Sequence, residues 1–172
     1  MDYLLPFSIE YAKEAHKGQV RKYTKEPYIT HPLGVAGMAY AVTNKEEVFI
    51  AGVLHDVVED TDRTLPMIQS IFGHSIARMV YEMTDISKPE DGNRATRKAI
   101  DRDFLSTAHP DTKTIKLADL IDNTKTIILF DSKFAKVYMK EKKLLLEVLK
   151  EGDPILYNIA EMMVDNYFNR RI

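Results

Sequence analysis

The chain has 172 residues, of which 24 are basic, 26 are acidic and none is cysteine, and it is long enough for one domain, residues 1–172, with its own core. The lack of cysteine excludes disulfides, thiolate metal sites and cysteine nucleophiles, and the net charge of −2 excludes the strong positive field of a nucleic-acid-binding domain. The N-terminus has no basic signal segment and no apolar run reaches the roughly 20 residues of a membrane span, so we expect a soluble cytoplasmic protein without a membrane span.

Helix start and stop signals recur along the first half of the chain, whereas the alternation typical of strands does not. The pattern therefore predicts an all-α fold. Pro6 is placed to open a first helix that Gly18 closes, and the side chains expected to face the core are those of Phe7, Tyr11, Ala12 and Ala15. After a lysine-rich loop, Pro32 opens a second helix over residues 33–42, and one continuous third helix is expected over 45–61.

The second half of the chain carries the same kind of signals. Thr64 reads as the N-cap of a helix with Pro66 in its first turn, and Gly73 ends that helix. A charged, turn-rich segment, residues 85–94, is predicted to be the one long loop. The remaining helices are expected over residues 75–84, 95–107, 112–130, 134–150 and 154–168, with breaks at His109-Pro110 and Gly152-Asp153-Pro154.

The stretch LHDVVEDT, residues 54–61, places one histidine and three carboxylates at the end of an apolar run. On a helix, His55, Asp56, Glu59 and Asp60 fall within roughly 140° of one another on one face, opposite the apolar residues. Such a helix packs its apolar face into the core while its acidic face points at something inside the protein. A cation is the natural partner for that face.

Four residues are candidate ligands of a divalent metal ion. A second histidine, His31, lies in YITHP at a predicted helix start, and Asp119 lies in the apolar segment IKLADLI. A buried carboxylate such as Asp119 is costly unless it meets a cation or hydrogen-bond donors. Together with His55 and Asp56, these residues would form a mixed nitrogen and oxygen site contributed by three helices, as divalent metals require.

The order of these residues resembles the HD-domain metal-dependent phosphohydrolases. The longer strings GQVRKYTKEPYITHP, LHDVVEDT and KLADLIDN resemble the hydrolase domain of RelA/SpoT homologues, which include stand-alone small alarmone hydrolases. The resemblance implies an all-helical fold that binds one divalent ion, usually Mn²⁺, through His31, His55, Asp56 and Asp119. It also implies a nucleotide substrate, guanosine tetra- or pentaphosphate, cleaved to GDP or GTP plus pyrophosphate.

The same resemblance implies that Glu59 and Asp60 are catalytic. One helical turn beyond His55 and Asp56, they would lie beside the metal without binding it, placed to orient water or to transfer a proton. The alternative is that they are solvated residues at a helix C-terminus. Carboxylates are disfavoured at that end of a helix dipole, which weakens this alternative.

A phosphorylated substrate also requires cations. Arg21, Lys22 and Lys25 precede the first metal histidine, and in the family the residues matching Arg21, Lys22 and Asn123 contact the nucleotide, while Tyr28 belongs to the PYITHP motif. Arginine suits bidentate phosphate binding, and lysine acts as a point charge. A second basic group contains Arg94, Arg97, Lys98 and Arg102. At least half of these residues are expected to belong to the solvated surface.

The chain departs from the family pattern at two positions. Many relatives carry a basic residue at the position of Leu120 and a histidine or tyrosine at the position of Asp122. These departures put the nucleotide preference in question. His16, His74 and His109 are interpreted as structural residues.

Two other functions remain open: hydrolysis of another nucleotide, such as a nucleoside monophosphate, a deoxynucleotide or NADPH, and a nucleotide-binding module without turnover. The sequence leaves the oligomeric state open.

Overall fold

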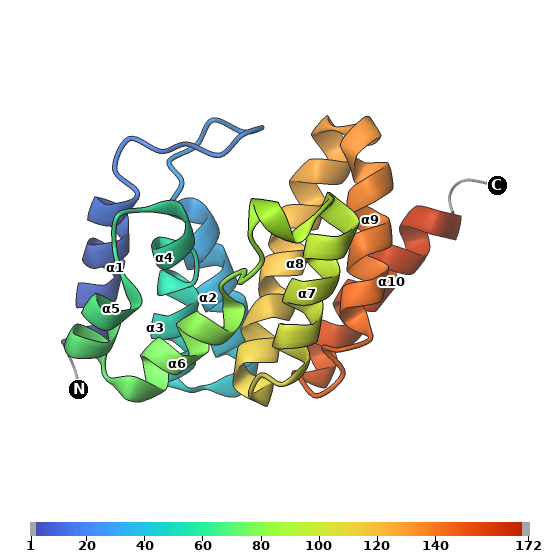
Figure 1. Cartoon of the computed structure of the whole chain (residues 1–172). Coiled ribbons are helices and arrows are strands. Elements are labelled where there is room, and N and C mark those ends of the chain that lie inside the picture. The colour runs from blue at the N-terminus through green and yellow to red at the C-terminus, as the bar shows by residue number, and fades with distance from the viewer. Residues whose placement is uncertain (1–2, 170–172) are drawn as a thin grey trace.

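The computed structural model describes residues 3–169, and within this range the protein is built from helices, with one isolated β-bridge between Val20 and Pro27. This confirms the predicted all-α fold. In chain order the helices are α1 (Leu4–Ala15), α2 (Thr30–Thr43), α3 (Glu46–Leu54), α4 (Val57–Asp60), α5 (Leu65–Phe72), α6 (His74–Met83), the 3₁₀ helix η1 (Pro89–Asp91), α7 (Arg94–Ser106), α8 (Pro110–Phe130), α9 (Ser132–Leu146) and α10 (Pro154–Asn169) (Figure 1).

Local signals explain most of the helix ends. Thr64 immediately precedes α5, and Gly73, with a φ of 88°, separates α5 from α6 in a conformation that favours glycine. The side chain of Asn93 accepts a hydrogen bond from the amide of Thr96 and caps α7. These boundaries confirm the predicted start of α5, its end at Gly73 and the beginning of a basic helix near residue 95.

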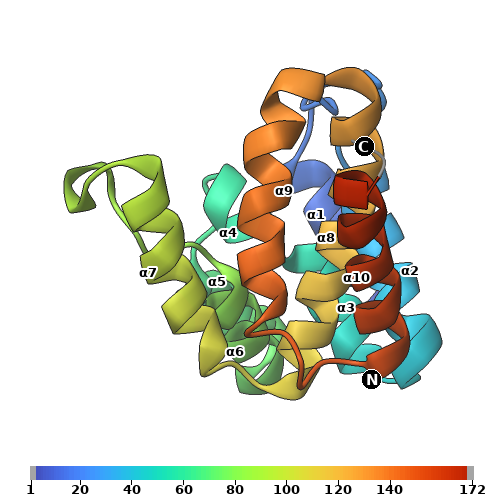
Figure 2. The ribbon, with the colours of Figure 1, turned by 90° about the vertical axis from the view of Figure 1, so that its right-hand side faces the viewer.

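Helix α8 lies at the centre of the molecule and packs against α2, α3, α6, α9 and α10. Its apolar residues Ile115, Leu117 and Leu120 are fully buried. Figure 1 shows α1 to α6 on one side of α8, with α9 and α10 on the other. The turned view in Figure 2 shows α7 standing apart from α9, with α4 between them at the upper end. A residue on α8 can therefore meet residues from both halves of the chain.

Two expectations about the first half are wrong. The helix predicted over 45–61 is two helices, because the chain turns at His55 and Asp56 between α3 and α4. The Gly52 carbonyl accepts a hydrogen bond from Nδ1 of His55 at 2.7 Å, and this side-chain bond competes with continuation of the helix. Phe7 is 41% exposed and packs at the surface against Tyr11 and Phe72 instead of entering the core.

None of the helices in the described part of the chain is both long enough and apolar enough to span a membrane.

Candidate metal centre and active-site cavity

The four predicted ligands come from three separate parts of the fold. His31 is the second residue of α2, His55 and Asp56 form the turn between α3 and α4, and Asp119 lies midway along α8. His31, His55 and Asp56 each offer a ligand atom, and these atoms lie within 4.8 Å of one another. Asp119 is adjacent, with its Oδ1 3.4 Å from Nε2 of His31. The group has the composition and the spacing of a site that could hold a metal ion.

His55 has a defined tautomer. Its Nδ1 lies 2.7 Å from the Gly52 carbonyl oxygen, which can only accept, so Nδ1 carries the proton. The other nitrogen, Nε2, is buried and has no hydrogen-bond partner among the described residues, although it lies 3.1 Å from Oδ2 of Asp56. In the neutral ring, a lone pair on Nε2 therefore faces a carboxylate oxygen. Two such groups attract only through a cation between them.

His31 is held in the same manner by a carboxylate. Its Nδ1 lies 2.7 Å from Oδ2 of Asp122, while its Nε2 lies 3.5 Å from Oδ2 of Asp56 and 3.4 Å from Oδ1 of Asp119. Burial opposes the charged imidazole, but hydrogen bonds with Asp119 and Asp122 outweigh it and raise the pKa of His31 to about 9. The site therefore has a strong affinity for positive charge.

Asp119 is satisfied by two neighbours on its own helix. Its Oδ1 accepts a hydrogen bond from Nδ2 of Asn123 at 2.5 Å, and its Oδ2 lies 3.2 Å from the Lys116 ammonium. Burial disfavours the carboxylate, but Lys116 and His31 hold the pKa of Asp119 well below its usual range. Asp119 is therefore ionised and directed at the cluster, as a metal ligand must be.

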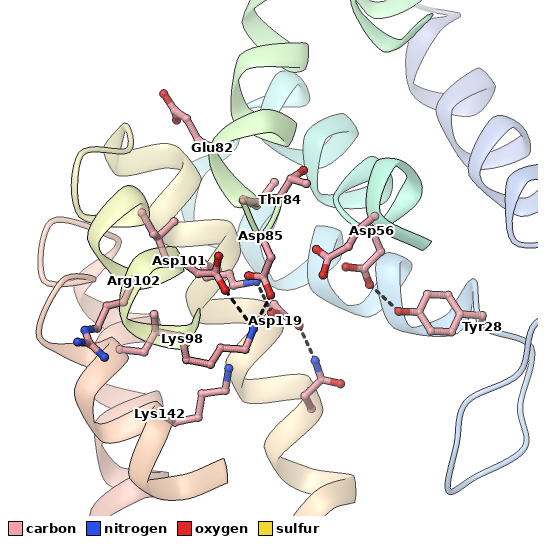
Figure 3. A pocket seen from close by; sticks show the side chains of 16 residues that line it. Tyr28, Asp56, Glu82, Thr84, Asp85, Lys98, Asp101, Arg102, Asp119 and Lys142 are labelled. Carbon is pink, nitrogen blue, oxygen red and sulfur yellow. Dashed lines mark hydrogen bonds and ion pairs between the residues drawn. The ribbon is translucent and has the colours of Figure 1, made fainter. Parts of the chain in front are cut away.

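A cavity of about 220 Å³ opens beside this cluster. Figure 3 shows Asp56 and Tyr28 on one side of it and Arg102, Lys98 and Lys142 on the other, with the carboxylates of Asp85 and Asp101 close to Lys98. Its lining residues come from the α3–α4 turn, the end of α6, and helices α7, α8 and α9. The cavity is therefore polar, and its lining contains both carboxylates and cationic side chains.

The predicted catalytic carboxylates occupy different positions around the cluster. Glu59 lines the cavity, and burial together with the nearby charge of Asp85 raises its pKa. Asp60 lies behind it, where its Oδ2 is 3.1 Å from the hydroxyl of Tyr28; that hydroxyl is also 2.7 Å from Oδ2 of Asp56. Burial and then Asp56 raise the pKa of Asp60. Tyr28 thus links a candidate catalytic residue to a candidate metal ligand.

The four predicted substrate residues surround a second, smaller cavity of about 130 Å³, lined by Arg21, Lys22, Tyr28 and Asn123 together with Tyr23, Thr24, Thr126 and Ile127. Tyr28 and Asn123 line both cavities, so the two adjoin. Arg21 donates to Oδ1 of Asn123 at 3.0 Å and lies 3.4 Å from Oδ2 of Asp122. Lys25 does not line either cavity and has a positive φ of 63° in the loop.

The second basic group divides into residues with and without acidic partners. Arg94 donates twice to Glu141, at 2.7 and 2.9 Å, and Lys98 pairs with Asp85 and Asp101. Arg97 lines a neighbouring cavity, and Arg102 lines the main one. Arg94 is exposed, whereas Arg97, Lys98 and Arg102 are partly buried, so less of this group is solvated surface than expected.

Sequence reasoning missed several residues of the site: Asp85, Lys116 and Lys142 line the main cavity, and Asp122 supports His31. The spacing of Lys116 and Asp119, one helical turn apart in IKLAD, is a signal that identifies Lys116. No local signal marks Lys142, which resembles its solvated neighbours in KEKKLLLEVLK. Of the two departures from the family pattern, Leu120 is a buried core residue, whereas Asp122 belongs to the site.

The histidines interpreted as structural occupy structural positions. His74 begins α6, and His109 caps α8 by accepting a hydrogen bond from the Asp111 amide. His16 follows α1, packs against Tyr28 with the rings tilted by 38° and their centroids 4.7 Å apart, and contacts Gln19 through Nδ1 at 2.9 Å.

Comparison with known proteins places this geometry among related chains. The model of the HD domain family matches residues 8–138. A protein of Aquifex aeolicus named guanosine-3′,5′-bis(diphosphate) 3′-pyrophosphohydrolase is 36% identical over 161 residues, which cover 91% of this chain and 22% of that protein. The chain thus spans less than a quarter of that relative, and it spans 16% of a similar one from Synechocystis.

Shorter relatives match more of their own length. The Drosophila melanogaster protein named guanosine-3′,5′-bis(diphosphate) 3′-pyrophosphohydrolase MESH1 is 34% identical over 122 residues, covering 69% of this chain and 66% of that protein. The solved structure of a metazoan ortholog of SpoT, described as hydrolyzing ppGpp, superposes with a TM-score of 0.84 at 25% identity and covers 95% of both chains.

Proposed function

Because this chain belongs to the HD-domain family, we propose that it is a metal-dependent phosphohydrolase that removes pyrophosphate from the 3′ position of guanosine tetra- and pentaphosphate. The observation that carries the proposal is the unpartnered, buried Nε2 of His55, which faces Asp56 beside a cavity lined by Glu59. The choice of substrate is supported by the activity for which the Aquifex and Drosophila relatives are named.

The proposed metal ligands are Nε2 of His31 and of His55 and the carboxylates of Asp56 and Asp119. Two imidazoles and two carboxylates suit a first-row divalent ion, and Mn²⁺ is the ion we propose. The residues fit this role because Nδ1 of each histidine is already engaged, by Asp122 and by the Gly52 carbonyl, which directs each Nε2 toward the ligand carboxylates. When bound, the ion supplies positive charge that acidifies water and polarises the phosphorus atom.

Glu59 is the proposed general base. Glu59 lies at the cavity wall. Its raised pKa makes its carboxylate a better acceptor of a proton from water, a proton that it can then return. The water oxygen forms a new bond to phosphorus, the bond from phosphorus to the ribose 3′ oxygen breaks, and that oxygen takes the proton from Glu59. Asp60 acts through the shared Tyr28 hydroxyl, which orients Asp56 and positions the water.

The nucleoside is proposed to occupy the smaller cavity. Arg21 and Asn123 line this cavity and are bonded to each other, so they form a fixed polar wall. Lys22 is largely exposed at the cavity edge and is placed to attract phosphate. Tyr28 and Asn123 also line the main cavity, so a nucleotide that spans both would reach the metal ligands with its 3′ substituent.

A nucleotide panel tests this function. The purified chain is assayed with Mn²⁺, Mg²⁺, Co²⁺ and Fe²⁺ for release of phosphate and pyrophosphate from guanosine tetraphosphate, nucleoside monophosphates, deoxynucleoside triphosphates and NADPH. We expect Mn²⁺-dependent pyrophosphate release from guanosine tetraphosphate with the highest kcat/KM. Preference for another nucleotide would reject the substrate, and binding without turnover of any of them would reject an enzymatic function.

A further inference from the structure

We propose that Lys142 of α9 and Arg102 of α7 form a binding site for the 5′-diphosphate of the nucleotide, the phosphate group remote from the bond that is cleaved. The inference rests on the proposed function and deepens it, since it assigns the second charged end of the substrate. It concerns residues that the sequence does not distinguish from surface cations.

The two side chains line the same space. Both contribute to the main cavity, and both also line a small adjoining cavity with Lys98, Glu141 and Leu145. Figure 3 shows Lys142 and Arg102 on the wall opposite Asp56 and Tyr28. A ligand that extends across the main cavity from the metal ligands therefore ends at these two cations.

The cations of this wall differ in whether they already have anionic partners. Lys116 is paired with Asp119, and Lys98 is paired with Asp85 and Asp101. Within residues 3–169, Lys142 and Arg102 make no hydrogen bond or ion pair; the contact of Lys142 is with the face of the Tyr138 ring, 4.8 Å from its centroid. They retain their full capacity to bind an anion.

The electrostatic environment of Lys142 also favours binding of an anion. Burial, followed by repulsion from Lys116 and Lys98, lowers the pKa of Lys142 to about 8, even though Asp119 attracts its charge. Asp119 and Glu141 attract this half-buried ammonium group without forming an ion pair with it, so its charge is only partly compensated. A phosphate group next to it would supply the missing charge.

The position also explains why one substrate would need two kinds of anion site. The 3′-diphosphate must reach Asp56, Asp119 and Glu59, where the protein itself is acidic and a metal ion is needed. A 5′-diphosphate in the same cavity would be repelled there. The wall formed by Lys142 and Arg102 offers cationic side chains without a metal ion.

The test compares two substrates on Lys142→Met, Arg102→Met and the control Lys143→Met, which changes an exposed lysine on the same helix. For guanosine tetraphosphate we expect each of the first two variants to raise KM about tenfold or more, the scale of one charge-assisted contact. For guanosine 3′-diphosphate, which lacks the 5′ phosphates, their KM is expected to stay within about twofold of wild type. Lys143→Met should match wild type on both substrates. Equal KM increases on the two substrates, or no increase on either, would overturn the assignment.

A binding measurement separates this inference from the proposed function. Inorganic pyrophosphate is titrated into the protein after chelation of metal, with circular dichroism as a check of folding. We expect Lys142→Met to weaken binding about tenfold and Lys142→Arg, which restores the charge, to recover most of it. Should the wild-type chain bind pyrophosphate through Lys142 and yet not cleave guanosine tetraphosphate, the proposed function fails while the anion site stands. Equal pyrophosphate affinity in wild type and Lys142→Met overturns the site.

Discussion

His55 carries one proton and one lone pair, and its surroundings decide which nitrogen holds each. The Gly52 carbonyl accepts a hydrogen bond from Nδ1–H, which leaves the lone pair of Nε2 facing Asp56. The sequence predicts His55 as a ligand from its type and spacing, but the tautomer depends on a carbonyl that only the turn after α3 brings near. The same is true of Asp122, whose role depends on contact with His31 across 91 positions of sequence.

Asp122 is expected to tune metal affinity without touching the metal. Replacement by asparagine keeps the shape and can still accept from Nδ1 of His31, but it removes the charge that makes the ring a stronger ligand. Asp122→Asn should weaken Mn²⁺ binding about 10- to 100-fold, the usual scale for such supporting residues. Titration calorimetry with Mn²⁺ measures this, with the exposed Asp165→Asn as the control. An unchanged dissociation constant in Asp122→Asn would contradict this role.

The two halves of LHDVVEDT should separate metal binding from chemistry. Asp56→Asn is expected to lose metal and activity together, as is Asp119→Ala, because each removes a proposed ligand. Glu59→Gln and Asp60→Asn should keep the metal and the fold but lose about 10²-fold or more in turnover, the scale of a positioned acid or base. Elemental analysis and single-turnover rates on the same preparations make the comparison. Wild-type turnover in the Glu59 and Asp60 variants would show that these residues are solvated and not catalytic.

At the scale of elements, the turn between α3 and α4 differs most from expectation. Apolar periodicity continues through residues 45–61 and therefore predicts one helix. The periodicity carries no information about the hydrogen bond that His55 donates to the Gly52 carbonyl. The helix starts at Asn93 and His109 follow from side-chain caps, a short-range chemistry, whereas Thr64 precedes α5 without a side-chain cap and Pro66 lies in its first turn. Features set by contacts between elements, such as the pairing of Lys98 with Asp85, are not predictable from such local signals.

Gly52 permits the close approach of α3 to α2, the helices that carry or precede the two candidate metal histidines. A Cβ on Gly52 would lie 2.9 Å from Cα of Ala36, so Gly52→Ala must push the two helices apart. We expect a loss of about 1–3 kcal/mol in the free energy of unfolding, together with weaker Mn²⁺ binding. Gly37→Ala, on α2 with nothing within 4 Å of its new Cβ, should instead stabilise by about 0.5–1 kcal/mol. Urea denaturation of both variants tests this, and the same sign of change in both would contradict it.

At the scale of the whole molecule, α8 joins the two halves of the chain. Its neighbours include α2 and α3 on one side and α9 and α10 on the other, and it contributes Asp119 to the cluster. The all-α class and the grouping of the four candidate ligands could be predicted because they depend on residue type and order along the chain. The cavity and its cationic wall could not, since α7, α8 and α9 form that wall only after packing.

A metal held by residues from α2, the α3–α4 turn and α8 should stabilise the entire fold. At about 100 times its dissociation constant, Mn²⁺ contributes about 2.7 kcal/mol, which corresponds to a Tm increase of about 5–10 °C for a chain of this size. Chelation should reverse the increase, and Asp56→Asn should show none. Differential scanning calorimetry measures all three. A Tm that Mn²⁺ leaves unchanged in the wild-type chain would mean that these elements are not joined by the ion.

The most direct test of the central claim follows the phosphorus atoms. Guanosine tetraphosphate labelled with ³²P in the terminal phosphate of its 3′-diphosphate is incubated with the Mn²⁺-loaded chain, and the products are separated by thin-layer chromatography. We predict that all released label appears as pyrophosphate, that GDP is the nucleotide product, and that chelation or Asp56→Asn abolishes both. Label released as single phosphate, label retained on a nucleotide shortened at its 5′ end, or intact substrate after incubation with the Mn²⁺-loaded chain would contradict it.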